Sequence, residues 1–240
     1  MSNPEPVDEQ GDTGGTYGDE AKKNGEQKGT GSEDEQFEDP AGDVGVVPSD
    51  AQFDSLIDIP KHPLQYHWVL WYCKPERGTK WEDCMKEVLT FNTVEDFWAM
   101  YNHIQPASGL TAGSDYYMFK KGIQPMWEDP QNCHGGRWLV TVERNRRDSV
   151  LDHYWLELLL ATIGEQFDVF GEFISGAVVN IRQKGDKVSL WTSDANREDV
   201  NRRIGQILKQ KLGIQEMITY ELHQDTKQKS SSMVKPHLRI

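Results

Sequence analysis

The segment Ala177–Trp191, AVVNIRQKGDKVSLW, predicts two β-strands joined by a turn. Residues 177–182 and 187–191 alternate as strands, and the Gln-Lys-Gly-Asp sequence between them is typical of a hairpin turn. Strand and helix signals interleave irregularly around this hairpin. We therefore expect an α+β fold, a curved and largely antiparallel sheet with three helices on its convex face.

Other segments rich in aromatic and β-branched residues predict further strands. His67–Lys74 should be a strand with large side chains on both faces, and a charged loop, Pro75–Asp83, should follow it. The remaining strand candidates are Tyr116–Phe119, Trp138–Val142 and Met217–Leu222.

The first helix is predicted from Thr93, an N-cap acting together with Asp96, to near Ile104. The second should be opened by Ser149 and Asp152. Asp194 or Asn196 should cap the third helix, and Gly213 should end it.

Charge separates the N-terminal segment from the rest of the chain. Residues 1–50 carry a net charge of −11 out of −13 for the whole chain and have only scattered apolar residues. Such a segment cannot bury enough surface to offset the entropy of ordering it. We expect a disordered tail over residues 1–55 and a folded domain over 56–240, mobile from about residue 224.

The residue patterns argue for binding and against catalysis. The chain has none of the common phosphate-loop, dinucleotide, zinc-protease or hydrolase motifs, and its seven histidines lack metal-ligand spacing. Cys73, Cys84 and Cys133 form no Cys-x-x-Cys pair, so we expect reduced thiols. We see neither a signal peptide nor a membrane span and expect a soluble, intracellular protein without metal or cofactor.

All eight tryptophans lie between residues 68 and 191, and two of them stand beside charged residues. Trp81 and Trp127 should be exposed on loops, where they could stack on a base, while Glu128 could accept two adjacent N–H groups of guanine. Arg182, Lys187 and Arg137 could bind phosphates. Trp68, Trp71, Trp138 and Trp155 should be core residues.

The sequence from about His62 to Ile240 resembles the eukaryotic translation initiation factor 4E family of messenger RNA cap-binding proteins. It carries the family's motifs at His62–Gln65, Thr93–Trp98, Pro125–Asp129, Gly135–Trp138 and Gly176–Arg182. Tryptophan at both Trp68 and Trp81 resembles the branch of active initiation factors.

The resemblance implies a pocket for 7-methylguanosine on the concave side of the sheet. Trp81 and Trp127 would sandwich the base, Glu128 would bind its N1 and N2 edge, and Trp191 would contact the N7 methyl group. Residues implied to bind the cap phosphates are Arg182, Lys187, Arg137, Lys184 and Lys229.

The resemblance also implies a protein-binding surface on the helical side, which we call the dorsal surface. It comprises His62, Pro63, Val94, Trp98, Leu156, Glu157 and Leu160. Its ligands would be Tyr-x-x-x-x-Leu-apolar peptides of the scaffold initiation factor 4G or of repressor proteins. Ser232 lies where the family has a phosphorylation site.

The resemblance leaves several alternatives open. The protein could be a cap-binding repressor that does not recruit the scaffold, whereas a cap-hydrolysing enzyme is disfavoured because no metal-binding cluster of Glu residues is present. Tolerance of a trimethylated cap is also open. We expect the protein to be a monomer outside the initiation complex. We expect it in the cytoplasm, and the sequence leaves a nuclear or RNA-granule location open.

Overall fold

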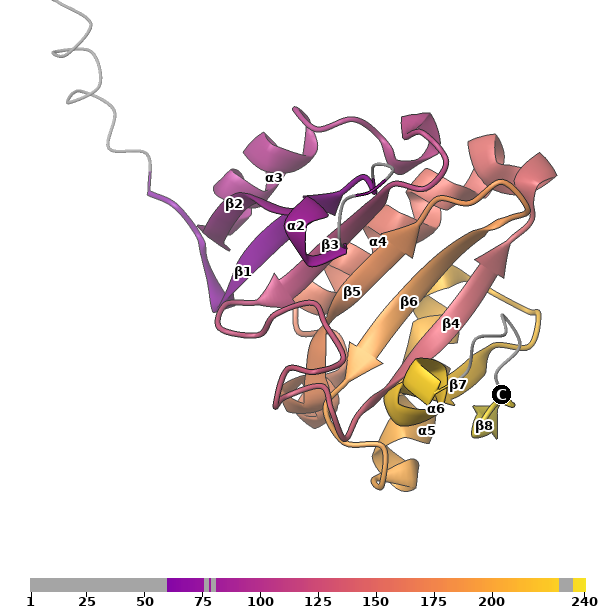
Figure 1. Ribbon diagram of the computed structural model, residues 1–240. Coiled ribbons are helices and arrows are strands. Elements are labelled where there is room, and N and C mark those ends of the chain that lie inside the picture. Colours follow the sequence, from indigo (N-terminus) through magenta and orange to yellow (C-terminus); the bar gives the residue numbers. More distant parts are fainter. Residues whose placement is uncertain (1–59, 76–77, 79–80, 229–234) are drawn as a thin grey trace, which may run out of the picture. The chain divides into compact units, whose positions relative to one another are not determined.

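The computed structural model describes residues 60–75, 78, 81–228 and 235–240. Eight strands form one curved antiparallel sheet in the order β2-β1-β3-β5-β6-β4-β7-β8 (Figure 1), which confirms the predicted α+β class. The strands are β1 (Pro63–Cys73), β2 (Met85–Thr93), β3 (Asp115–Lys120), β4 (Gly136–Val142), β5 (Ile174–Asn180), β6 (Asp186–Thr192), β7 (Thr219–Leu222) and β8 (Leu238–Arg239). The predicted N-terminal tail, Lys229 and Ser232 lie outside the described residues.

The predicted hairpin is confirmed and lies in the middle of the sheet. β5 and β6 pair antiparallel, with Val178 opposite Ser189. Gly185, at the end of the turn, has a φ of +145°, which side chains other than glycine rarely adopt. The backbone conformation at this position therefore explains why Gly185 is a glycine.

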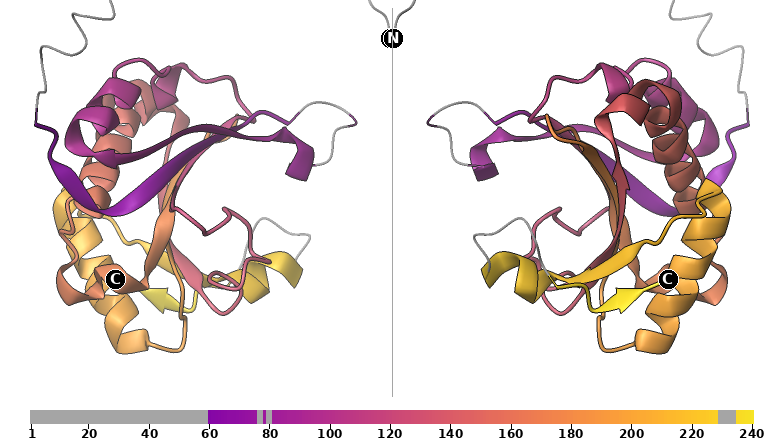
Figure 2. Two further views of the ribbon diagram at one scale, coloured as in Figure 1. Left: turned by 90° about the vertical axis from the view of Figure 1, so that its left-hand side faces the viewer. Right: turned by 90° about the vertical axis from the view of Figure 1, so that its right-hand side faces the viewer.

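Three helices cover the convex face of the sheet, as predicted (Figure 2): α3 (Val94–Tyr101), α4 (Asp152–Ile163) and α5 (Glu198–Leu212). Side chains alternate between the two faces along each strand. Trp68 and Leu70 of β1 therefore lie in the large core under the helices, whereas Cys73 belongs to a second, smaller cluster. Trp71 was predicted to lie in the core, but it packs against that second cluster, on the concave face.

The concave side carries two short helices and a long loop. Figure 2 places α2 (Trp81–Cys84), α6 (His223–Gln228) and the loop of residues 121–135 there, opposite the three long helices. This loop joins β3 to β4, which are separated in the sheet by β5 and β6. Among the described residues, no helix is long and apolar enough to cross a membrane.

The helix-capping predictions were partly right. The Thr93 hydroxyl accepts a hydrogen bond from the backbone N–H of Asp96, as predicted, although α3 ends at Tyr101 and not near Ile104. Gly213 ends α5 in the left-handed conformation. The predicted N-caps of the other two helices, α4 and α5, were wrong.

No side chain caps α4 or α5. A short π-helical segment, η3 (Arg147–Leu151), leads into α4, and the Asp152 carboxylate accepts hydrogen bonds from the backbone and side chain of Ser108 instead of from its own helix. The N-cap of α5 is Arg197. The Asp194 carboxylate closes a local turn by accepting from the backbone N–H of Asn196.

The C-terminal region contains two elements that the sequence analysis did not predict, α6 and β8. β7 begins at Thr219, after the predicted start at Met217, and the chain continues into α6. The last strand, β8, pairs with β7, with Thr219 opposite Arg239, and the Leu238 side chain is buried. These contacts link residues about twenty positions apart, which local sequence patterns do not reveal.

The prediction that all three cysteines are reduced was also wrong. Cys73 and Cys84 form a disulfide, and only Cys133 is a free thiol. The antiparallel pairing of β1 with β2 puts Cys73 opposite Met85, so the preceding residue, Cys84, lies within bonding distance. The disulfide therefore closes the segment that contains Trp81.

Candidate functional site

A small apolar cluster on the concave face, which we call the concave cluster, brings several of the predicted site residues together. Its buried members are Cys73, Cys84, Tyr117, Phe119, Val178 and Trp191, and Trp71, Met85, Ile123 and Trp127 pack against them. Trp191 makes an edge-to-face contact with Phe119. Two of the three tryptophans expected in the base pocket, Trp127 and Trp191, thus belong to one cluster.

Several buried polar atoms around this cluster lack hydrogen-bond partners in the described part of the chain. They are the indole N–H groups of Trp71, Trp127 and Trp191 and both ring nitrogens of His223. Trp68 and Trp155 share this property, but they are enclosed under the helices, whereas Trp71 and Trp127 are partly exposed. Unpaired buried polar atoms beside partly exposed aromatic rings are typical of a ligand site.

The loop that carries Trp127 is fixed from within. Asn132 is fully buried and its side-chain amide donates to the backbone carbonyls of Gln124 and Met126, at 2.9 and 3.0 Å. The Asp129 carboxylate accepts from the backbone N–H of Gln124 at 2.8 Å. We did not predict these supporting residues, although a Pro-Gln-Asn sequence after Asp129 is a usual turn signal.

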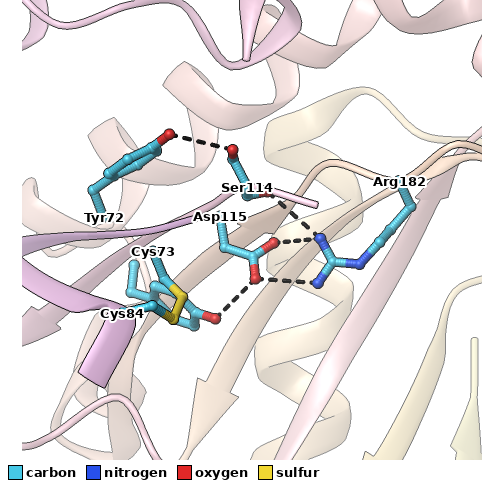
Figure 3. Close-up of a disulfide and its surroundings, with 7 residues drawn as sticks. Tyr72, Cys73, Cys84, Ser114, Asp115 and Arg182 are labelled. Atoms are coloured by element: carbon cyan, nitrogen blue, oxygen red, sulfur yellow. Dashed lines mark hydrogen bonds and ion pairs between the residues drawn. A yellow bond between two sulfur atoms is a disulfide. The ribbon is translucent and has the colours of Figure 1, made fainter. Parts of the chain in front are cut away.

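The loop and α2 also place the other two base-pocket candidates. Glu128 follows Trp127 directly and is exposed. The main chain of Trp81 begins α2, which the disulfide ties to the end of β1 beside Asp115 (Figure 3). The side chain of Trp81 lies outside the described residues.

Three predicted phosphate-binding cations lie on the concave face. The Arg182 guanidinium binds the buried carboxylate of Asp115 through two hydrogen bonds of 2.6 and 3.1 Å (Figure 3). Arg137 donates two hydrogen bonds, of 3.1 and 2.8 Å, to a single oxygen of the Glu221 carboxylate. Neither carboxylate was anticipated, because each is brought to its arginine by strand pairing: Arg137 is opposite Glu221, and Asp115 is opposite the end of β5.

Lys187 lies close to both arginines. Burial lowers its pKa, and the positive charges of Arg137 and Arg182 lower it further. Within the described residues no carboxylate forms an ion pair with Lys187. A half-buried ammonium group flanked by two guanidinium groups favours an incoming anion. Lys184, by contrast, is exposed in the hairpin turn.

The predicted dorsal-surface residues share the convex side. A hydrogen bond from the backbone N–H of Val94 to the carbonyl of His62 joins the start of α3 to the segment before β1. Trp98 is 36% exposed and packs edge-on against Phe97 and Tyr101. On the neighbouring helix α4, Leu156, Glu157 and Leu160 are partly exposed. An exposed tryptophan that is held rigidly is typical of a protein-binding surface.

His223 should make the stability of the protein depend on pH. Its ring lies 4.2 Å from the Trp191 ring, and burial together with the charge of Arg137 lowers its pKa to about 3. In the unfolded chain its pKa is about 6.5, so the unfolded state binds the extra proton first as the pH falls. The contribution of neutral His223 to the free energy of unfolding is therefore complete above pH 6.5 and is lost progressively as the pH falls below that value.

The measurement is urea unfolding of the wild type and of His223→Gln at pH 7 and pH 5. The loss of unfolding free energy between the two pH values should be smaller in the variant by about 2 kcal/mol. Because other groups titrate equally in both proteins, the comparison isolates His223. Equal losses in the two proteins would contradict the assignment.

Comparisons with known proteins agree with this geometry. Residues 63–237 match the family model described as eukaryotic initiation factor 4E. Eukaryotic translation initiation factor 4E-3 of Caenorhabditis elegans is 59% identical over 203 residues, which are 82% of this chain and 80% of that protein.

Two similar proteins have been solved as complexes with ligands. The complex of Ascaris suum eIF4E-3 with an m2,2,7G cap has 64% identity and a TM-score of 0.71, covering 75% of this chain and 99% of that one. The complex of C. elegans eIF4E-3 with the 4E-binding protein Mextli and a cap analog has 60% identity and a TM-score of 0.70, covering 75% and 100%.

Proposed function

Since this chain belongs to the eukaryotic initiation factor 4E family, we propose that it binds the 7-methylguanosine cap of messenger RNA on its concave face and a translation partner on its dorsal surface. The observation that carries the proposal is that the tryptophans of the concave cluster share the concave face of the sheet with three cations, Arg182, Lys187 and Arg137. Members of the family bind caps and catalyse no reaction.

The base would be held by stacking and by its edge. Methylation at N7 gives guanine a delocalised positive charge, and a cation between two indole faces gains about 0.5–2 kcal/mol or more for each desolvated contact. Trp127 supplies one face, and Trp81 supplies the other in this proposal. The Glu128 carboxylate would accept the two N–H groups on the base edge, which adenine cannot offer.

The phosphate chain would lie along Arg182, Lys187 and Arg137. Charge-assisted hydrogen bonds to phosphate oxygens are about twice as strong as neutral ones. Arg182 keeps 43% of its side chain exposed although it is paired with Asp115, so it can bind a second anion. Lys184, which is exposed in the hairpin turn, would be a weaker phosphate contact, and Lys229 stays a prediction.

The dorsal surface would bind a peptide of the Tyr-x-x-x-x-Leu-apolar type. The similar C. elegans protein has been solved with the 4E-binding protein Mextli, so partner binding is a property of close relatives. The exposed Trp98 of α3, together with the partly exposed Leu156 and Leu160 of α4, fits an apolar helix face. A repressor without scaffold binding is therefore the less favoured function.

The test is a titration of tryptophan fluorescence in the wild-type protein. The triphosphate of 7-methylguanosine should quench the fluorescence, and unmethylated GTP should bind at least about tenfold more weakly, because it lacks the cation–π energy. A trimethylated cap analogue belongs in the same series, because the Ascaris relative was solved with m2,2,7G. Equal affinities for the methylated triphosphate and GTP would contradict the proposal.

A further inference from the structure

A buried ion pair closes the β5–β6 turn from the convex side. Asp186, the first residue of β6, is fully buried, and its two carboxylate oxygens accept from the Arg147 guanidinium at 2.6 and 2.7 Å. Arg147 is the first residue of η3, the segment that leads into α4. The pair therefore links the helical layer to the hairpin.

This pair holds the main chain of Arg182 from both sides. The backbone N–H of Arg182 donates to Asp186 at 2.9 Å, and its backbone carbonyl accepts from Arg147, also at 2.9 Å. Its side chain is held separately, by Asp115 on the concave face. The position of the Arg182 guanidinium thus depends on two ion pairs, one on each face of the sheet.

We propose that Arg147 is a positioning residue for the phosphate chain of the cap: together with Asp186 it fixes the main chain of Arg182, and so places the guanidinium that binds the phosphates. The inference rests on the function proposed above and deepens it. Arg147 does not touch the ligand.

The energetics favour a rigid arrangement. A bidentate arginine–carboxylate pair has a defined geometry, and a fully buried carboxylate has no solvent to replace a lost partner. Burial opposes the charge of Arg182, and the pairing with Asp115 more than compensates, raising the pKa of Arg182. Small displacements of a charged group weaken its contacts steeply, so a loose turn would weaken phosphate binding without changing the base pocket.

The experiment compares two ligands, the nucleoside 7-methylguanosine and its 5′-triphosphate, in wild type and Arg147→Met. Their affinity ratio measures what the phosphates contribute. In the variant the triphosphate should bind about tenfold more weakly while the nucleoside changes less than about twofold. Arg146→Met is the matched control, because the neighbouring Arg146 pairs with the exposed Glu216 and should leave the ratio unchanged.

Arg147→Lys keeps the positive charge but not the bidentate geometry, and it covers the case in which Arg147→Met does not fold. In Arg147→Lys the ratio of the triphosphate affinity to the nucleoside affinity should be about threefold lower than in the wild type. An unchanged ratio in a folded Arg147 variant, or an equal loss for both ligands, would overturn the positioning role. Wild-type protein that fails to bind the triphosphate would instead overturn the proposed function, so the two failures are distinct.

Discussion

Replacing Trp127 by alanine should weaken binding of 7-methylguanosine triphosphate by about a hundredfold or more. Stacking on an aromatic face contributes about 1–3 kcal/mol per base, and the methylated base adds the cation–π term. The two contributions together amount to about 1.5–5 kcal/mol, and the middle of that range exceeds the roughly 2.8 kcal/mol that corresponds to a hundredfold change in affinity. Retention on an immobilised cap analogue, followed by fluorescence titration, is the measurement.

The control for Trp127→Ala is partner binding. Trp127 packs against the concave cluster, and the loop that carries it lies on the side of the sheet opposite the three long helices, so the variant should still bind a Tyr-x-x-x-x-Leu peptide with wild-type affinity. Trp127→Phe keeps an aromatic face and should lose only part of the affinity. If Trp127→Ala stayed within about threefold of wild type, base stacking at this position would be refuted.

Replacing Trp98 by alanine should give the reverse result. Interface tryptophans often contribute 2 kcal/mol or more, so the affinity for the same peptide should fall by about thirtyfold or more. Cap binding should be unchanged, because Trp98 lies on α3 and takes no part in the concave cluster. Isothermal titration with the peptide and fluorescence titration with the cap analogue measure the two affinities.

A matched control is available for the Trp98 variant. Met217 is an exposed apolar residue, 66% exposed, and the dorsal surface does not include it. Met217→Ala should leave both affinities unchanged. If Trp98→Ala and Met217→Ala bound the peptide equally well, the docking surface would have to lie elsewhere.

Much of the fold could be predicted because it depends on local patterns. The hairpin around Gly185, the Thr93 cap and the alternation of Trp68 with neighbouring side chains are all set by residues within a few positions of one another. The charged neighbours of Trp81 and Trp127, together with the resemblance to a family, suggested them as stacking residues. The two-residue strand β8 has no pattern of its own and forms only because β7 is already in place.

The supporting residues of the site could not be predicted for the same reason. Asp115 and Arg182 are 67 positions apart, and Arg137 and Glu221 are 84 apart. Their contacts exist only once the strand order and register are known. The disulfide of Cys73 likewise depends on which residue of β2 lies opposite it.

The paired carboxylates bear on how the protein could tell the end of an RNA from its interior. The three cations on the concave face, Arg182, Lys187 and Arg137, and the carboxylates of Asp115 and Glu221 have a net charge of only +1. Non-specific binding of RNA depends on many phosphate contacts that release counterions, and so small a charge supports few of them. An internal stretch of RNA backbone would therefore bind only weakly to the concave face. Only the capped end of the RNA, which also offers a positively charged base for stacking, would bind tightly. The carboxylates would therefore keep the protein from binding at internal positions of the messenger RNA.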